Sequence, residues 1–328
     1  MTDGDSEALA LIGDIGGTNC RLAVTPATPS PRPQVSRVRT YPAADYPTFE
    51  DAVAAYIEEE EVSVTRAVIA VAGPVADGEV AMTNHPWRIS ERDLAAKLGG
   101  AKSRLINDFE ALAHALPALT ADDLAPLGPP RKATEHSNMA VMGAGTGFGT
   151  AAMVRNAGNQ TVLVGEGGHS AFAPSDALEA EIWQRLAARF AGYVQVEHVL
   201  SGPGLVNLHR ALCEIEGKAT SFETPDAITD AADTGDPRAL AVTDRFVRIF
   251  GAVAGDLAVI YGARSGVFIA GGVSQRILTA RNGPAFRARL EAKGEFSPYV
   301  VAIPTWLITH DQPGLLGAAC ALADAAAD

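Results

Sequence analysis

The sequence predicts an α/β fold made of two domains with related topology. Two apolar segments, 8–24 and 138–154, are each typical of a strand, a glycine-rich turn and a second strand. They begin about 130 residues apart and share an architecture rather than a sequence. A chain of 328 residues is also long enough for about two domains. We therefore expect two halves of the same plan that face each other.

The first half of the chain alternates between predicted strands and helices. A Pro-rich loop at 25–34 follows the first hairpin, and 50–61 has a helical pattern. Residues 66–75 are typical of a buried strand that ends in a Gly-Pro turn, and 103–117 predict a short strand followed by a helix. The polar, Pro-rich stretch 120–138 is the predicted junction between the domains.

The second half is mostly helical after its hairpin. Helical patterns dominate 176–264, and 266–277 predict a strand, a Gly-Gly turn and a helix. The chain then closes with a predicted strand at 301–310 and an Ala-rich helix after Asp311.

Composition excludes several classes of protein. Apolar residues make up 47% and charged residues 20%, which is close to a soluble globular average and enough for a sizeable core. The net charge of −13 comes without a basic patch, so we expect neither a nucleic-acid partner nor binding to an anionic membrane. Cys20, Cys213 and Cys320 are far apart, which argues against a disulfide framework or a zinc site.

No targeting or membrane segment is predicted. The first ten residues, MTDGDSEALA, have neither the basic start nor the apolar run of a secretory signal. No apolar run reaches the ~18 residues that a membrane span needs. We expect a cytoplasmic location.

The turn of the first hairpin is the first candidate site. Glycines in a tight turn let backbone N–H groups approach an anion closely. Asp14 could hold Mg²⁺ through a bound water, without direct ligation by protein side chains. An ordinary hairpin explains Gly-Gly alone, whereas the string D-x-G-G-T-N favours a phosphate site. The candidate residues are Gly13, Asp14, Ile15, Gly16, Gly17, Thr18 and Asn19.

Two further glycine turns could contact a nucleotide. Gly145, Thr146 and Gly147 match neither a Walker A loop nor a dinucleotide fingerprint, which leaves an amide-lined turn that either binds phosphate or is purely structural. Gly271 and Gly272 follow a predicted strand and open a helix. They could admit the ribose or base of a nucleotide, or they could form a tight strand-to-helix turn.

Acidic and polar residues beside other turns are candidates for catalysis and sugar binding. Asn107 and Asp108 lie where a strand runs into a helix, so each could be a helix N-cap, and Asp108 could instead accept a proton from a hydroxyl nucleophile. Glu166 and His169 sit on a glycine loop that suits a small polar ligand. Glu197 precedes a predicted helix start. These three side chains could equally be solvated surface groups.

The ordered motifs resemble the bacterial-type ATP-dependent glucokinase family. In chain order they are D-x-G-G-T-N, M-T-N-H-P-W, I-N-D-F, G-A-G-T-G-x-G, G-E-G-G-H, E-x-V-L-S-G-P-G-L, F-I-A-G-G and H-D-Q-P-G-L-L-G. The match runs from about residue 9 to about residue 320. The related repressor and kinase group carries a Cys-rich zinc motif after the sugar-binding His, and HSAFAPSDALEAE has no Cys.

The resemblance implies a two-domain ribonuclease-H-like (hexokinase/actin-like) fold with an interdomain cleft. The small domain would comprise 1–118 and 311–328, and the large domain 119–310. ATP with Mg²⁺ would be the cofactor, glucose the substrate, and a homodimer the assembly. A kinase for another hexose or an amino sugar, and a non-catalytic sugar or nucleotide sensor, are the alternatives.

The resemblance also implies a role for each candidate residue. Asp108 would be the catalytic base, and the turns at 13–19 and 143–149 would be the two phosphate loops. Gly271 and Gly272 would contact the adenosine. The sugar would be bound by Asn107, Asp108, Glu166, His169 and Glu197.

Overall fold

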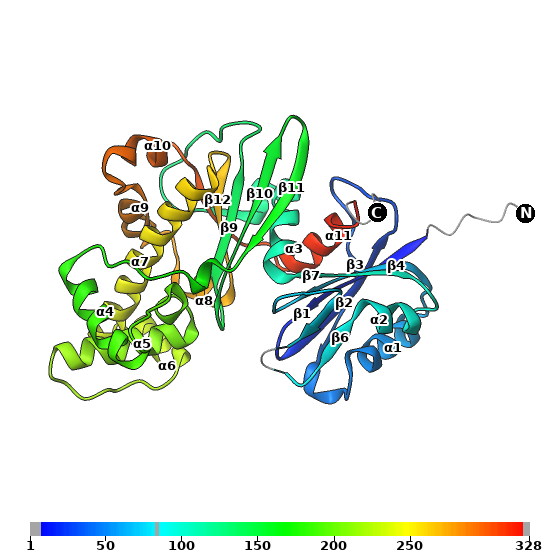
Figure 1. Cartoon of the computed structure of the whole chain (residues 1–328), viewed down its shortest axis with the longest axis horizontal. Helices are drawn as coiled ribbons and strands as arrows, with labels where there is room; N and C mark the ends of the chain where they lie inside the picture. The colour runs from blue at the N-terminus through cyan, green and yellow to red at the C-terminus, as the bar shows by residue number, and fades with distance from the viewer. Residues whose placement is uncertain (1–7, 83–84, 324–328) are drawn as a thin grey trace, which may run out of the picture. The chain divides into compact units, whose positions relative to one another are not determined.

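The computed structural model describes residues 8–82 and 85–323 of the chain. The chain divides into two compact units (Figure 1). Unit 1 contains the residues up to 120 together with those from 310 onward, and unit 2 contains residues 121–309. Thr83 and Asn84, which belong to the M-T-N-H-P-W motif, lie outside the described residues.

Unit 1 is built on a five-stranded sheet of order β3-β2-β1-β4-β7. Its strands are β1 (Leu9–Ile15), β2 (Asn19–Pro26), β3 (Ser36–Pro42), β4 (Val64–Val71) and β7 (Lys102–Asn107). β1 pairs with β2 in an antiparallel hairpin and with β4 in parallel, and β4 pairs with β7 in parallel. The carboxyl ends of β1, β4 and β7 therefore meet at one edge of the sheet.

Helices cover both faces of this sheet, because β1 directs apolar residues to each face. Leu11 and Ile15 belong to a core that includes Phe49 of α1 (Phe49–Glu60), whereas Ala10 and Ile12 pack with Leu315 of α11 (Pro313–Cys320). The remaining elements of unit 1 are η1 (Ala43–Asp45), β5 (Glu79–Ala81), β6 (Arg88–Ser90), α2 (Glu91–Lys97), α3 (Asp108–Ala115) and η2 (Leu116–Ala118).

Unit 2 repeats this plan in a six-stranded sheet of order β11-β10-β9-β12-β13-β8. The strands are β8 (Leu124–Pro126), β9 (Met139–Ala144), β10 (Phe148–Asn156), β11 (Asn159–Gly165), β12 (Gly266–Ala270) and β13 (Thr305–Ile308). β9 pairs antiparallel with β10 and parallel with β12, as β1 does with β2 and β4. The predicted similarity of topology between the halves is confirmed.

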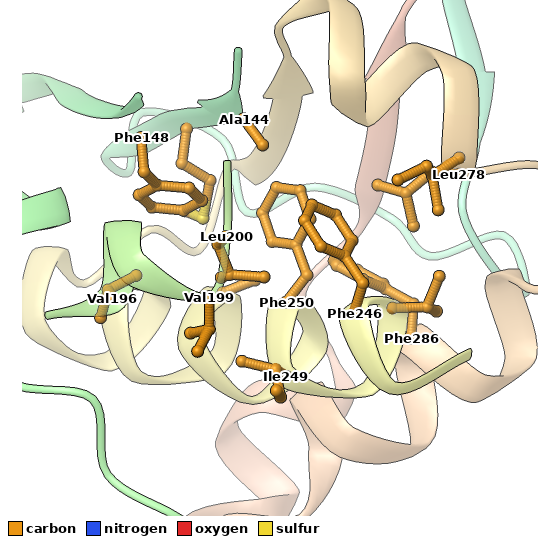
Figure 2. Packing of buried hydrophobic residues seen from close by; sticks show 14 of the residues in the cluster. Ala144, Phe148, Val196, Val199, Leu200, Phe246, Ile249, Phe250, Leu278 and Phe286 are labelled. Atoms are coloured by element: carbon orange, nitrogen blue, oxygen red, sulfur yellow. The ribbon is translucent and has the colours of Figure 1, made fainter. Parts of the chain in front are cut away.

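An aromatic core supports the second sheet. Phe250 of the long helix α7 (Pro237–Tyr261) makes edge-to-face contacts with Phe148, Phe246 and Phe286 (Figure 2). The other elements are η3 (Ala121–Asp123), η4 (Gly167–His169), α4 (Ala177–Arg189), η5 (Val196–His198), α5 (Gly202–Ile215), α6 (Pro225–Asp233), α8 (Gly272–Ile277), α9 (Gly283–Glu291), η6 (Gly294–Phe296) and α10 (Ser297–Val301).

The boundary between the units lies between Thr120 and Ala121, at the start of the predicted junction 120–138. That stretch also contains η3 and β8, and β8 is the edge strand that pairs antiparallel with β13. The strand predicted at 301–310 is shorter, because α10 starts with Pro298 in its first turn and extends to Val301. Among the described residues, none of the helices combines the length and apolar character that crossing a membrane requires.

Candidate active site

The first glycine turn joins β1 to β2 in unit 1. The Gly16 amide donates to the Asn19 carbonyl at 3.0 Å, and Ala43 N donates to the Thr18 carbonyl at 2.9 Å. A Cβ added at Gly16 would lie 3.9 Å from its nearest neighbour, Asn19 O. Space around Gly16 is therefore left for a ligand to approach the backbone closely.

Asp14 lies at the carboxyl end of β1, beside this turn. Arg21 of β2 contacts it with Nη1 3.3 Å from Oδ2. Gly314 at the start of α11 lies against the same carboxyl group, since a Cβ added there would be 2.8 Å from Asp14 Cγ. Burial raises the pKa of Asp14, and the Arg21 charge opposes that shift.

Asn107 is the N-cap of α3. Its Oδ1 accepts hydrogen bonds from the amides of Phe109 at 2.9 Å and Glu110 at 3.3 Å, and its Nδ2 donates to the Gly73 carbonyl at 3.1 Å. The Glu110 side chain completes a capping box with the Asn107 amide. Of the two N-cap candidates, Asn107 fills the cap, which leaves the Asp108 carboxyl group available for another role.

Asp108 is the first residue of α3, at the sheet edge where Asp14 also lies. Its Oδ1 accepts from the Phe109 amide at 3.0 Å. Burial, and after it the nearby charge of Asp14, raise the pKa of Asp108 to about 7. A carboxylate with this pKa is matched to accepting a proton at neutral pH.

The chemistry of Asp14 fits a magnesium ion carried by phosphates. Mg²⁺ usually keeps several waters and is bound through one or two carboxylates plus substrate phosphates. Asp14 is a single carboxylate. Its pKa is raised because burial disfavours the charged form more than Arg21 stabilises it. Within residues 8–82 and 85–323, no group of three or more His, Cys, Asp or Glu side chains could hold a metal by itself. These residues fit an ion that arrives with a nucleotide.

The second glycine turn joins β9 to β10 in unit 2. The Gly145 amide donates to the Gly147 carbonyl at 2.8 Å, and Gly202 N at the start of α5 donates to the Gly145 carbonyl at 2.8 Å. A Cβ added at Gly145 would have no neighbour within 4 Å, so this turn also has room for a ligand. Ala144 is the last residue of β9, as Ile15 is of β1, and Gly143 stands where the first hairpin has Asp14, so the strand end carries no carboxylate.

Glu197 is half-buried in η5 and contacts the second turn. Its Oε2 accepts a hydrogen bond from the Phe148 amide at 2.9 Å. The Ser201 hydroxyl, at the N-cap of α5, donates to the Glu197 carbonyl at 2.8 Å. A Cβ on Gly147 would meet Oε2 of Glu197, so a side chain at that position would displace the carboxylate. Glu197 is therefore not a freely solvated surface group.

Glu166 and His169 lie together on the loop that follows β11. His169 Nε2 is 3.8 Å from Glu166 Oε2, and His169 Nδ1 is 3.1 Å from Oε1 of Gln195. Both side chains are exposed and can meet a ligand. The loop is attached to β10 through the buried Thr150, whose Oγ1 accepts from the Gly167 amide at 3.2 Å.

Gly271 and Gly272 form the turn between β12 and α8. Gly271 has φ +88°, and a Cβ there would overlap the Ala144 carbonyl, so only glycine fits. Gly272 has open space around it. The buried Ser274 hydroxyl accepts from the Ala144 amide at 2.8 Å and so links α8 to the end of β9.

The structure thus groups the predicted residues within each unit. Asp14, Asn107 and Asp108 share one sheet edge in unit 1, while Glu197 and the turn at 145–147 are in contact in unit 2. Sequence reasoning missed the residues that orient the candidates, which are Arg21, Thr150, Gln195, Ser274 and Gly314. Arg21, Thr150 and Gly314 had a signal, because they lie in or beside the quoted motifs.

Comparison with known proteins gives one consistent result. The crystal structure of glucokinase from an Antarctic psychrotroph has a TM-score of 0.87 and 35% identity, with 96% of this chain and 99% of that chain covered. A ROK family glucokinase from Streptomyces griseus, crystallised with glucose and AMPPNP, has a TM-score of 0.64 at 22% identity and covers 95% of this chain and 98% of its own. The predicted hexokinase/actin-like fold is confirmed.

Sequence relatives agree with the structural ones. Glucokinase of Caulobacter sp. (strain K31) is 45% identical over 323 residues, which cover 98% of this chain and 97% of the relative. A sequence model described as glucokinase matches residues 11–325. Because both matches span nearly the whole chain, the protein belongs to the glucokinase family.

Proposed function

We propose that this chain transfers the γ-phosphoryl group of ATP to the 6-hydroxyl of glucose, giving glucose 6-phosphate and ADP. One observation carries the proposal beyond family membership. Asp108 is a carboxyl group whose pKa is raised to about 7, and it lies beside the Asp14 turn. A non-catalytic sugar or nucleotide sensor has no need of such a base.

Asp108 is assigned as the general base. Its carboxylate accepts the proton of the 6-hydroxyl while the sugar oxygen attacks the γ-phosphorus. The new O–P bond forms as the bond from the γ-phosphorus to the bridging oxygen breaks, and ADP leaves with that electron pair. Asn107 holds the start of α3 and thereby orients Asp108.

Charge and orientation are assigned to the remaining candidates. The amides of the turns at 13–19 and 143–149 face phosphate oxygens, and Gly271 and Gly272 lie against the adenosine. Asp14 would hold Mg²⁺ through a water, and an ion held there would supply positive charge to the phosphates. Glu166, His169 and Glu197 accept or donate hydrogen bonds to sugar hydroxyls, together with Asn107 and Asp108.

An ADP-release assay over a panel of hexoses and amino sugars tests the substrate. We expect the highest kcat/KM with glucose and no ADP release without sugar. A higher kcat/KM with another hexose or an amino sugar would support the alternative kinase. Tight hexose binding with no ADP release in a pure preparation would support a sensor.

Glu166→Gln tests the sugar site without touching the glycine turns. We expect the glucose KM to rise by about an order of magnitude, because charge-assisted hydrogen bonds are roughly twice as strong as neutral ones. The ATP KM should change less than about twofold. An unchanged glucose KM would remove Glu166 from the sugar site.

Two parts of the proposal concern assembly and location. From the family resemblance alone we infer a homodimer, which sedimentation at several protein concentrations tests. From the sequence patterns we infer a cytoplasmic location, which cell fractionation tests.

A further inference from the structure

The first residues of β10 are contacted from both segments that carry candidate sugar ligands. Glu197 Oε2 accepts from the Phe148 amide at 2.9 Å, and Gly167 N donates to Thr150 Oγ1 at 3.2 Å. Gly168 lies so close to the Phe148 carbonyl that a Cβ would overlap it. The start of β10, which follows the second glycine turn, thus contacts and supports both segments that carry candidate sugar ligands.

Phe148 is fixed in the core of unit 2. Its side chain is 4% exposed, and its ring lies 5.4 Å from that of Phe250 in an edge-to-face contact (Figure 2). The preceding turn is held on its other side by the Gly202 amide, which donates to the Gly145 carbonyl. Packing of Phe148 and the hydrogen bond from Gly202 hold the two ends of the turn in place. The Glu197 carboxylate is the group in contact with the turn that can change its position.

We propose that Glu197 is a positioning residue that couples the two substrates: the carboxylate that binds glucose also orients the Phe148 amide and, through it, the second phosphate turn. This inference rests on the proposed function. Glucose would order Glu197, and the ordered carboxylate would hold the turn in its phosphate-binding geometry. Coupling free energies are reciprocal, so nucleotide bound at the turn would strengthen glucose binding by the same factor.

Coupling that does not pass through Glu197 is the competing explanation, and the two glycines of the turn separate the two. A Cβ at Gly147 would meet the far end of the Glu197 side chain, which can swing away without disturbing the backbone. A Cβ at Gly145 would meet no protein atom within 4 Å. Neither glycine has a positive φ, so alanine is not strained at either position.

The test is calorimetric titration of the full chain with glucose in the absence of nucleotide. We expect Gly147→Ala to weaken glucose binding at least about tenfold, although Gly147 belongs to the phosphate turn. The matched control, Gly145→Ala, should leave the glucose Kd within twofold of the parent. Both variants should bind AMPPNP with Mg²⁺ more weakly, because each adds a methyl group to the phosphate turn.

A second pair of variants tests the same coupling by changing a candidate sugar ligand and measuring nucleotide binding. Glu197→Asp keeps the charge but shortens the reach to the Phe148 amide, so the Kd for AMPPNP with Mg²⁺ should rise at least about fivefold without glucose present. Glu166→Asp, a matched glutamate without a contact to the turn, should change that Kd less than twofold. Melting temperatures identify any variant that fails to fold. If a variant of one pair fails to fold, the other pair of variants tests the coupling.

The outcomes separate this inference from the proposed function. A parent chain that binds glucose, with Gly147→Ala binding it equally well, would refute the coupling and leave the kinase assignment intact. Unchanged AMPPNP binding by Glu197→Asp would refute it in the same way. A parent chain that binds no hexose would refute the proposed function and the coupling with it.

Discussion

The two glycine hairpins share one topology but differ in chemistry. In both units a strand runs parallel to its neighbour, turns through glycines and returns antiparallel. The first strand carries Asp14, next to its last residue, beside Asp108, whereas the second has Gly143 at that position and receives a carboxylate from Glu197 in a distant segment. The same scaffold therefore presents a charged edge in one unit and a turn bonded to a distant carboxylate in the other.

The hairpins also differ in how tightly their glycines are enclosed. A Cβ at Gly13 would lie 2.9 Å from the side-chain Cδ1 of Ile69, which can shift. A Cβ at Gly143 would overlap the backbone carbonyl of Ala270, which cannot. The comparison teaches that a glycine of one hairpin can be required by close backbone packing, whereas a glycine of the other meets only a side chain that can move.

Removing magnesium should have the largest effect, and it should act through the Asp14 hairpin. We expect EDTA to abolish phosphoryl transfer and added Mg²⁺ to restore it, because the unit 2 hairpin has no carboxylate at the corresponding strand end. Asp14→Asn should raise the Mg²⁺ concentration needed for half-maximal rate about tenfold or more. A tightly bound zinc found by elemental analysis would contradict this prediction.

Asp108→Asn should lower kcat by about 10²–10⁴-fold, because the amide keeps the shape of the side chain but cannot accept a proton. Glucose and AMPPNP should still bind, as calorimetry can show. Near-normal turnover in a pure preparation would remove Asp108 from the role of base.

Stability measurements on the same variant separate chemistry from folding. The pKa of Asp108 is raised from 3.8 to about 7, so the folded state holds this proton more tightly than the unfolded chain does. Ionisation of Asp108 therefore opposes folding increasingly as the pH rises from about 4 to about 7. Asp108→Asn should raise the free energy of unfolding at pH 8 by about 1–3 kcal/mol, measured by urea denaturation.

The pH dependence of kcat/KM should be set by Asp108 and its neighbour Asp14 in unit 1. Below about pH 7 Asp108 is protonated and cannot accept a proton, so kcat/KM should fall about tenfold for each further pH unit. Asp14→Asn removes the neighbouring negative charge and should move this limb to lower pH. A flat profile from pH 5 to 8 with the parent chain would contradict the assignment.

Replacing Gly143 or Gly13 by alanine should have the smallest effect, a change in the free energy of unfolding. Gly143→Ala should lower the free energy of unfolding by about 1–3 kcal/mol, since the added methyl group meets backbone. Gly13→Ala should cost less than about 1 kcal/mol, because the Ile69 side chain can move. Urea denaturation followed by tryptophan fluorescence compares the two. Equal losses would mean that the hairpins are equally enclosed.

Much of the architecture was predictable because it depends on residue patterns within short segments of the sequence. The β1–β2 and β9–β10 hairpins and helix α1 appear where apolar alternation, glycine turns and helical spacing predict them. The edge strand β8 was missed, because three residues with two partly exposed apolar side chains carry too little periodicity. Its pairing with β13 depends on a segment about 180 residues away.

The sequence by itself determined the order of the motifs, the glycine turns and the candidates for base and sugar ligands. Only the tertiary structure decided that Asp108 is buried beside Asp14, and that Glu197 bonds to the Phe148 amide. The physical reason is distance along the chain. Turn and helix preferences act over a few residues, whereas burial beside Asp14 and a hydrogen bond across 49 positions exist only once the sheet brings those segments together.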